Sequence, residues 1–189
     1  MKLLLSFVIM FCLWGGVPSS FKRAMTLRYA TPNLSPKGVR HDGYYLKAEK
    51  NNRVYGYGKN SYKPDTLYWG CIFYNDNSYC EFSIEDIYNL NDLNIEYWGV
   101  YTVEGSLVRA QFMDPSTNGG GVSERIYHLL KNGLTASMWI QYKSKGFGRH
   151  ERKETFYETP EEYHFVSSPN LPPSDSWLKK EKWMYEPVR

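Results

Sequence analysis

Apolar and polar side chains alternate along much of the middle of this chain, which is the pattern of β-strands that bury one face. The pattern is clearest in residues 96–113, where it predicts a β-hairpin. The predicted turn is Glu104-Gly105, because glycine readily takes the positive φ that short hairpin turns require. With that turn, Tyr97 lies opposite Phe112, and their face is nearly all apolar. Two strands cannot stand alone in water, so this hairpin requires a larger sheet.

A second hairpin is predicted over residues 124–143. It turns at Asn132-Gly133, a dipeptide strongly favoured in two-residue hairpin turns. This turn places Tyr127 opposite Met138 on one face of the sheet. Trp139 then falls on the other face.

The chain begins with a segment typical of exported proteins. After a short basic start, residues 3–14 are apolar and uncharged, a run shorter than the roughly 20 residues that cross a bilayer. This run and the small residues after it predict a secretory signal peptide over residues 1–19, with a mature chain starting near Ser20. The alternatives are an uncleaved membrane anchor and lipidation at Cys12. After cleavage we expect no membrane span.

A third hairpin is predicted over residues 67–82, closing over residues 74–77. This register places Cys71 opposite Cys80, the two cysteines that remain once the signal peptide is removed. An even number of cysteines in an exported chain indicates a disulfide. Closing so short a loop would stabilise the fold by roughly 2.5–3 kcal/mol in the chain-entropy account. The alternative is two buried thiols that never pair.

Further strands are predicted at both ends of the sheet. One opens the domain at residues 42–48, and residues 49–66 hold either a ragged edge strand or a long loop. Two charged strands at residues 150–157 and 162–166 are expected to pair across a turn at residues 158–161.

Two short helices complete the predicted elements. Ser83 and Asp86 have the spacing of a capping box and predict a short internal helix. A C-terminal helix is predicted to pack Trp177, Leu178 and Met184 against the sheet.

Eight or nine strands joined by local hairpins predict an all-β fold, an antiparallel up-and-down meander that closes into a barrel and so removes its edges. The 17 tyrosines support this class, because aromatic residues favour strands. We expect a signal peptide at 1–19, a polar leader at 20–40 that runs over the surface or stays loose, and a single barrel domain at 41–189. The net charge of +3 comes without a dense stripe of Lys and Arg, which argues against nucleic-acid binding.

The first strand opens with Gly43-Tyr44-Tyr45, which resembles the Gly-x-Trp motif in the first strand of lipocalin-like (calycin) barrels. Gly43 matches, and Tyr45 stands in the tryptophan position. The order of strands over residues 40–185, with a helix after the last one, is also similar. The chain further resembles small exported bacterial proteins of lipocalin-like type, through the Trp-Gly-x-Tyr element at residues 98–101. The resemblance implies a binding or envelope role and places Tyr45 inside the barrel, whereas simple alternation places Tyr44 there.

Motifs for catalysis and metal binding are not found. The four histidines, His41, His128, His150 and His164, form no zinc pattern, and there is no nucleophile elbow. A cluster of carboxylates, Glu154, Glu158, Glu161 and Glu162, is better explained as a solvated rim at a turn than as an acid–base pair. We therefore expect a protein that is not an enzyme and uses no cofactor or metal.

The inner face of the barrel is the remaining candidate site. Its predicted ligand-binding residues are Trp69, Tyr97, Tyr101, Phe112, Tyr127 and Met138. One interpretation is a lipocalin-like binding module, periplasmic, envelope-bound or secreted, that holds a small apolar or amphipathic ligand. The alternative is that these side chains fill a solid core, and that the domain contacts an envelope protein through exposed aromatics such as Trp98 and Trp139.

Overall fold

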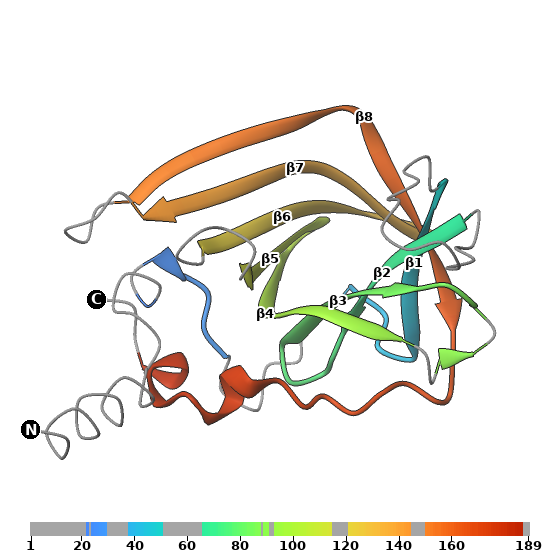
Figure 1. Cartoon of the computed structure of the whole chain (residues 1–189), viewed down its shortest axis with the longest axis horizontal. Helices are drawn as coiled ribbons and strands as arrows, with labels where there is room; N and C mark the ends of the chain where they lie inside the picture. The colour runs from blue at the N-terminus through green and yellow to red at the C-terminus, as the bar shows by residue number, and fades with distance from the viewer. Residues whose placement is uncertain are drawn as a thin grey trace, which may run out of the picture.

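The computed structural model describes residues 22, 24–29, 38–50, 66–87, 89–90, 93–114, 121–144 and 150–186. Within these ranges the chain forms a closed antiparallel barrel in which each strand pairs with its neighbours in sequence, and β8 pairs with β1 (Figure 1). The strands are β1 (Gly43–Lys50), β2 (Thr66–Phe73), β3 (Ser78–Ile84), β4 (Asn94–Glu104), β5 (Leu107–Asp114), β6 (Gly121–Leu130), β7 (Gly133–Ser144) and β8 (His150–Ser167). The predicted meander closing into a barrel is confirmed. The predicted signal peptide and residues 51–65, most of the predicted edge strand or loop, lie outside the described residues.

The barrel closes through a short contact between its first and last strands. Only four residue pairs join β1 to β8, from Gly43 with Ser167 to Leu46 with His164. Gly43 permits this approach, because a Cβ there would lie 2.1 Å from the carbonyl oxygen of Val166. Any side chain at this position would push the two strands apart.

The β4–β5 hairpin turns one residue later than predicted. Its turn residues are Gly105, with φ of +62°, and Ser106, so Phe112 lies opposite Gly99 and not opposite Tyr97. The pairing has moved by an even number of residues, and each side chain therefore keeps its predicted face.

The register of the β2–β3 hairpin differs from the predicted register by one residue, and this shift separates the two cysteines. Asn77 adopts a positive φ of 65°, and the loop closes so that Cys71 lies opposite Glu81 and Cys80 opposite Ile72. A slip of one residue exchanges the two faces of a strand. Cys71 therefore lies inside the barrel, Cys80 lies in a cluster on its outer side, and both are buried free thiols. The predicted Cys71–Cys80 bridge is wrong.

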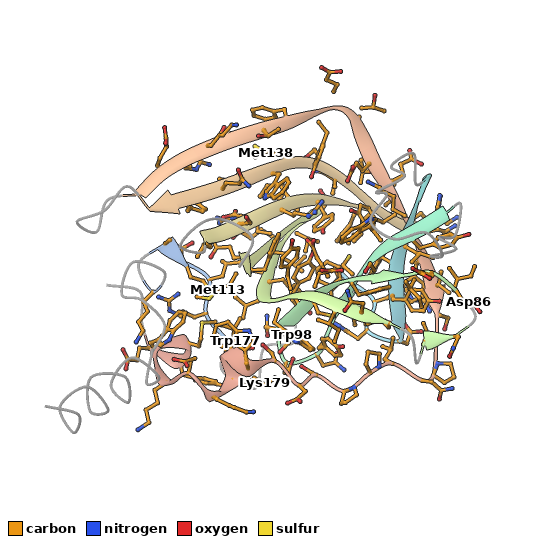
Figure 2. The ribbon with its side chains drawn as sticks, in the orientation of Figure 1. Asp86, Trp98, Met113, Met138, Trp177 and Lys179 are labelled. Carbon is orange, nitrogen blue, oxygen red and sulfur yellow. The ribbon has the colours of Figure 1, made fainter. Side chains whose placement is uncertain are left out.

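The β6–β7 hairpin turns at Lys131-Asn132, one residue before the predicted turn, and contains a bulge. Beyond the bulge, Trp139 lies opposite Arg125, on the inner face, and Met138 takes the outer face. The sequence prediction had exchanged these two side chains. Figure 2 shows Met138 on the outer arc of β7, away from the crowded centre of the barrel.

β8 is continuous where a turn was predicted, and it bends sharply at one point (Figure 1). Between the pairs Ala136–Glu161 and Met138–Phe156, four residues of β8 lie opposite the single Ser137 of β7. Pro160 falls in this unpaired stretch, where its missing N–H costs no ladder hydrogen bond. Phe156 consequently pairs with Met138 of β7. It does not pair with residues 162–166, which was the prediction.

Neither predicted helix is an α-helix. Ser83 belongs to the end of β3, and the described residues after it form turns. The C-terminal segment forms two 3-10 turns, η2 (Trp177–Lys180) and η3 (Lys182–Tyr185). Leu178 and Met184 are buried as predicted, whereas Trp177 is exposed.

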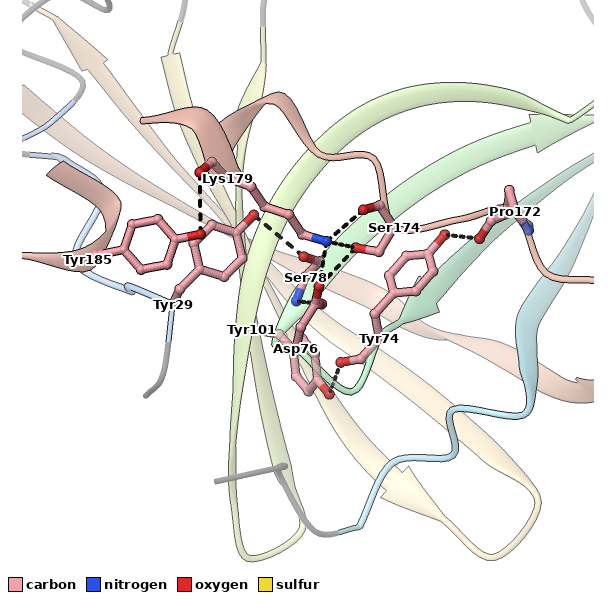
Figure 3. Close-up of polar contacts among 9 residues, drawn as sticks. All are labelled: Tyr29, Tyr74, Asp76, Ser78, Tyr101, Pro172, Ser174, Lys179 and Tyr185. Atoms are coloured by element: carbon pink, nitrogen blue, oxygen red, sulfur yellow. Dashed lines mark hydrogen bonds and ion pairs between the residues drawn. The ribbon is translucent and has the colours of Figure 1, made fainter. Parts of the chain in front are cut away.

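The C-terminal segment is attached to the β2–β3 loop by a charged contact (Figure 3). The Lys179 ammonium lies 2.5 Å from Asp76 Oδ2 and donates hydrogen bonds to the carbonyl and hydroxyl oxygens of Ser174, both at 2.6 Å. Partial burial of Asp76 opposes its charge, but Lys179 and the hydrogen bonds from Ser78 together outweigh this effect and lower the pKa of the carboxyl.

The described part of the leader is packed against the barrel and not loose. In residues 24–29, Met25 is fully buried, and the backbone amides of Thr26 and Leu27 donate to Gln111 Oε1 at 2.8 and 2.7 Å. This segment and the C-terminal turns cover one outer face of the sheet.

The barrel interior holds one large aromatic cluster. Tyr45 belongs to it, while Tyr44 packs in a separate cluster on the outer side, so the inward residue is the one that the Gly-x-Trp resemblance indicated. Tyr101 and Phe112 are at most 1% exposed and fill the middle of the barrel. Beyond this plug, an open cavity lies in one end of the barrel.

Candidate functional site

A cavity of about 260 Å³ lies inside one end of the barrel. Six aromatic side chains form much of its wall: Trp69, Tyr97, Tyr127, Trp139, Tyr157 and Tyr163. Four charged side chains, Lys47, Glu81, Arg125 and Glu161, complete it. Inward-facing positions of seven strands, all except β5, supply these groups, so the site depends on the closed barrel.

The floor of the cavity is a hydrogen-bonded carboxylate. Glu81 is 4% exposed, and its Oε1 accepts a hydrogen bond of 2.6 Å from the hydroxyl of Tyr79. The Tyr79 and Tyr127 hydroxyls are also 2.6 Å apart. Tyr79 and Glu81 meet because alternate residues of one strand share a face. The Nε of Arg125 lies 2.7 Å from the same Oε1, which completes a buried ion pair.

The upper part of the cavity carries a second, less buried set of charges. Arg125 Nη1 donates to the Tyr157 hydroxyl at 3.1 Å and lies 3.7 Å from Glu161 Oε2. Lys47 donates to the other oxygen of Glu161 at 2.5 Å. The bend of β8 brings Tyr157 and Glu161 over the end of the barrel.

The charges of the site balance and reinforce one another. Burial disfavours the charge of Arg125, but Glu81 and the neighbouring tyrosines together outweigh this effect and raise the pKa of the guanidinium well above its ordinary value. Burial also raises the pKa values of Tyr127 and Tyr163, so both hydroxyls stay protonated at neutral pH. The cavity therefore contains two cations, two carboxylates and neutral phenols.

Trp139 has an unusual environment. The Arg125 guanidinium lies over its ring, 5.4 Å from the ring centroid, in a cation–π contact. Its indole Nε1 is buried and has no hydrogen-bond partner in the part of the chain that the structure describes. Buried N–H groups are rarely left unpaired, because each one costs free energy on leaving water. This donor is therefore a candidate contact for a bound molecule.

The structure divides the six residues predicted to bind a ligand. Trp69, Tyr97 and Tyr127 line the cavity, Tyr101 and Phe112 lie in the packed core, and Met138 lies on the outer face. The charged half of the site was missed. Arg125 lies two residues before Tyr127, and Glu81 two residues after Tyr79, so alternation could have placed both inside. Glu161 was assigned to a solvated rim, although it is one of the cavity's four charged groups.

The predicted patch of exposed aromatics does not form from Trp98 and Trp139. Trp98 packs on Tyr74 with ring centroids 6.0 Å apart, and Trp139 lines the cavity. The large apolar side chains that are exposed in the described ranges lie on separate elements: Leu130, Phe156, Trp177 and Tyr185.

Neither a cluster of metal-ligating side chains nor a long apolar helix occurs among the described residues. No group of three or more His, Cys, Asp or Glu there could hold a metal ion. No described helix has the length and apolar character needed to span a bilayer. His41, one of the four histidines, places its Nδ1 3.0 Å from the carbonyl of Phe73.

Comparisons with protein-family models, with curated proteins and with solved structures each gave no match to this chain. The function must therefore be argued from the site itself.

Proposed function

We propose that this protein binds a small amphipathic molecule in the cavity at the end of its barrel. The observation that carries the proposal is the cavity wall, in which six aromatic rings surround a set of hydrogen-bonded charges. Ligand sites typically combine apolar surface for affinity with a few polar groups for orientation. The volume of about 260 Å³ falls slightly below the ~300–1,000 Å³ of sites for drug-sized ligands, so a ligand about the size of one substituted ring is expected.

The packed core supports the alternative of a structural or interaction domain. Tyr101 and Phe112 leave no open space in the middle of the barrel, and a closed barrel can be stable without a ligand. The buried ion pair favours the binding proposal over this alternative, because a buried pair adds little stability compared with apolar residues of similar volume. The buried ion pair is explained if its role is to orient a bound molecule.

The proposal also includes the cellular location that the sequence predicts. Residues 1–19 have the pattern of a signal peptide, which indicates an exported protein of the periplasm, the envelope or the extracellular medium. A role without catalysis likewise remains our prediction. N-terminal sequencing of the protein from the producing cells tests the export step, and a start near Ser20 is the expected result.

Native mass spectrometry of the protein purified from its own export route tests the binding proposal. A reproducible small-molecule adduct that leaves on unfolding is the expected result. Adding the identified molecule back to ligand-free wild-type protein should change the tryptophan fluorescence. The variant Trp139→Phe should show a smaller change. Trp177→Phe is the matched control, since Trp177 is exposed and lies outside the cavity. A clean mass without adduct, and no fluorescence response to extracts of the producing cells, would support the interaction domain instead.

A further inference from the structure

The balance of charge in the cavity restricts the ligand that it can hold. Glu81 and Arg125 are 5% and 14% exposed in their side chains, and Lys47 and Glu161 are 19% and 24% exposed. Each cation lies against a carboxylate, at 2.7 Å for the first pair and 2.5 Å for the second. A ligand with a net charge would add an uncompensated charge to this enclosed space, which is strongly unfavourable. The site therefore favours a neutral molecule.

Two donor groups of the cavity, on Trp139 and Arg125, have hydrogen-bonding capacity that the described residues do not fully use. Trp139 Nε1 is buried without a partner among the described residues. The contacts of Arg125 with described residues use Nε and Nη1, although a guanidinium has five N–H groups. The buried Oε1 of Glu81, in contrast, already accepts from Tyr79 and faces Arg125. A ligand that supplies an acceptor oxygen would satisfy the unmet donors.

The walls of the cavity indicate the shape of the rest of the ligand. Trp69, Tyr97 and Trp139 present aromatic surface from three different strands, and flat rings pack well on such surface. The Arg125 guanidinium lies over the Trp139 ring, 5.4 Å from its centroid, and this cation–π contact favours the observed placement of the indole. The indole ring is therefore positioned before a ligand arrives.

We infer that the ligand is a small neutral aromatic molecule whose carbonyl-type oxygen accepts a hydrogen bond from Trp139 Nε1. This inference rests on the proposed function and names the chemical class of the ligand. It assigns Trp139 as the specificity-determining residue, and Arg125 as the residue that positions it. The two pairs Glu81–Arg125 and Lys47–Glu161 keep charged analogues out.

Four benzene derivatives of similar size test the inference on the full-length protein: acetophenone, ethylbenzene, benzoate and benzylammonium. Ethylbenzene matches acetophenone in shape but lacks the acceptor oxygen. Ligand-observed NMR titrations give the affinities for the wild type, for Trp139→Phe and for Trp177→Phe. Phenylalanine keeps an aromatic ring at position 139 and removes only the N–H and part of the ring area, and circular dichroism verifies that each variant is folded.

In the wild type and in Trp177→Phe, acetophenone should bind about five-fold more tightly than ethylbenzene, as one hydrogen bond to a buried donor provides. In Trp139→Phe this preference should disappear. Both charged probes should bind at least about ten-fold more weakly than acetophenone, because each adds an unpaired charge to the site.

Three results would overturn the inference. Equal affinities of acetophenone and ethylbenzene for the wild type would reject the inferred hydrogen bond to Trp139 but not the proposed binding function. Tighter binding of benzoate or benzylammonium than of acetophenone shows that the site selects a charge. If no probe binds, the adduct seen by native mass spectrometry decides, since a charged adduct or one without an acceptor oxygen rejects the neutral carbonyl class. The absence of both probe binding and an adduct would reject the proposed function as well.

Discussion

Removing one partner of the buried ion pair should destabilise the barrel more than removing both. Arg125→Met keeps much of the side-chain volume but leaves the Glu81 carboxylate, only 5% exposed, without its cation. Breaking a buried pair in this way typically costs about 3–5 kcal/mol. For a domain of this length, that corresponds to a fall in Tm of very roughly 10 °C.

The paired substitution separates this cost from a general loss of packing. Glu81→Gln keeps an oxygen that can accept from Tyr79, and together with Arg125→Met it leaves neither charge unpaired. We expect the double variant to cost at least about 2 kcal/mol less than the sum of the two single variants. Arg152→Met is the control, because the Arg152–Glu154 pair is exposed and its loss should have little effect on stability.

Guanidinium unfolding followed by circular dichroism measures these free energies, provided that the wild type and all four variants unfold with similar m-values. Additive effects of Glu81→Gln and Arg125→Met would refute the reasoning, because they would show that the two charges do not interact. A cost below about 1 kcal/mol for Arg125→Met would refute it too, since the carboxylate would then be solvated well enough to need no cation.

Two further predictions concern the outer side of the barrel and the free thiols. Burial raises the pKa of Cys80 to about 12, from an ordinary value of 9.0, so the unfolded chain loses this proton first and stability should fall as pH rises between these values. This thiol should lower the free energy of unfolding by about 1.4 kcal/mol per pH unit in this range. In Cys80→Ala the free energy of unfolding should therefore fall less steeply with pH. An unchanged slope would show that Cys80 is not the group responsible. Gln111→Met should leave the Thr26 and Leu27 amides and Glu124 short of partners, cost about 2–4 kcal/mol, and speed hydrogen exchange at those two amides. Unchanged exchange there would mean that packing of Met25 holds the segment without the glutamine.

Alternation along the strands was sufficient to predict the class of fold and part of the site. Trp69, Tyr97 and Tyr127 line the cavity, because the side chains of a strand face alternate sides and the aromatic face is the buried one. The β4–β5 turn was misplaced, yet the faces of Tyr97 and Phe112 were predicted correctly, because the register changed by an even number of residues.

Single-residue irregularities account for the wrong assignments. The β2–β3 loop placed Cys71 and Cys80 on opposite faces, and the bulge in β7 exchanged Met138 for Trp139. Such changes leave almost no mark on local composition, since a left-handed Asn77 or an unpaired Ser137 is compatible with many sequences. The disulfide and the inward methionine were both lost in this way.

The sequence by itself determined which segments form strands, that these strands are antiparallel, and that aromatic side chains fill the barrel, because period and turn chemistry are local properties. The tertiary structure alone decided where the charges meet. Lys47, Glu81, Arg125 and Glu161 are far apart in sequence, and only closure of β8 onto β1 brings them together around one cavity. There each charge is stabilised by the others, which no local pattern could indicate, because the energy of a buried charge depends on its partners and not on its neighbours in the chain.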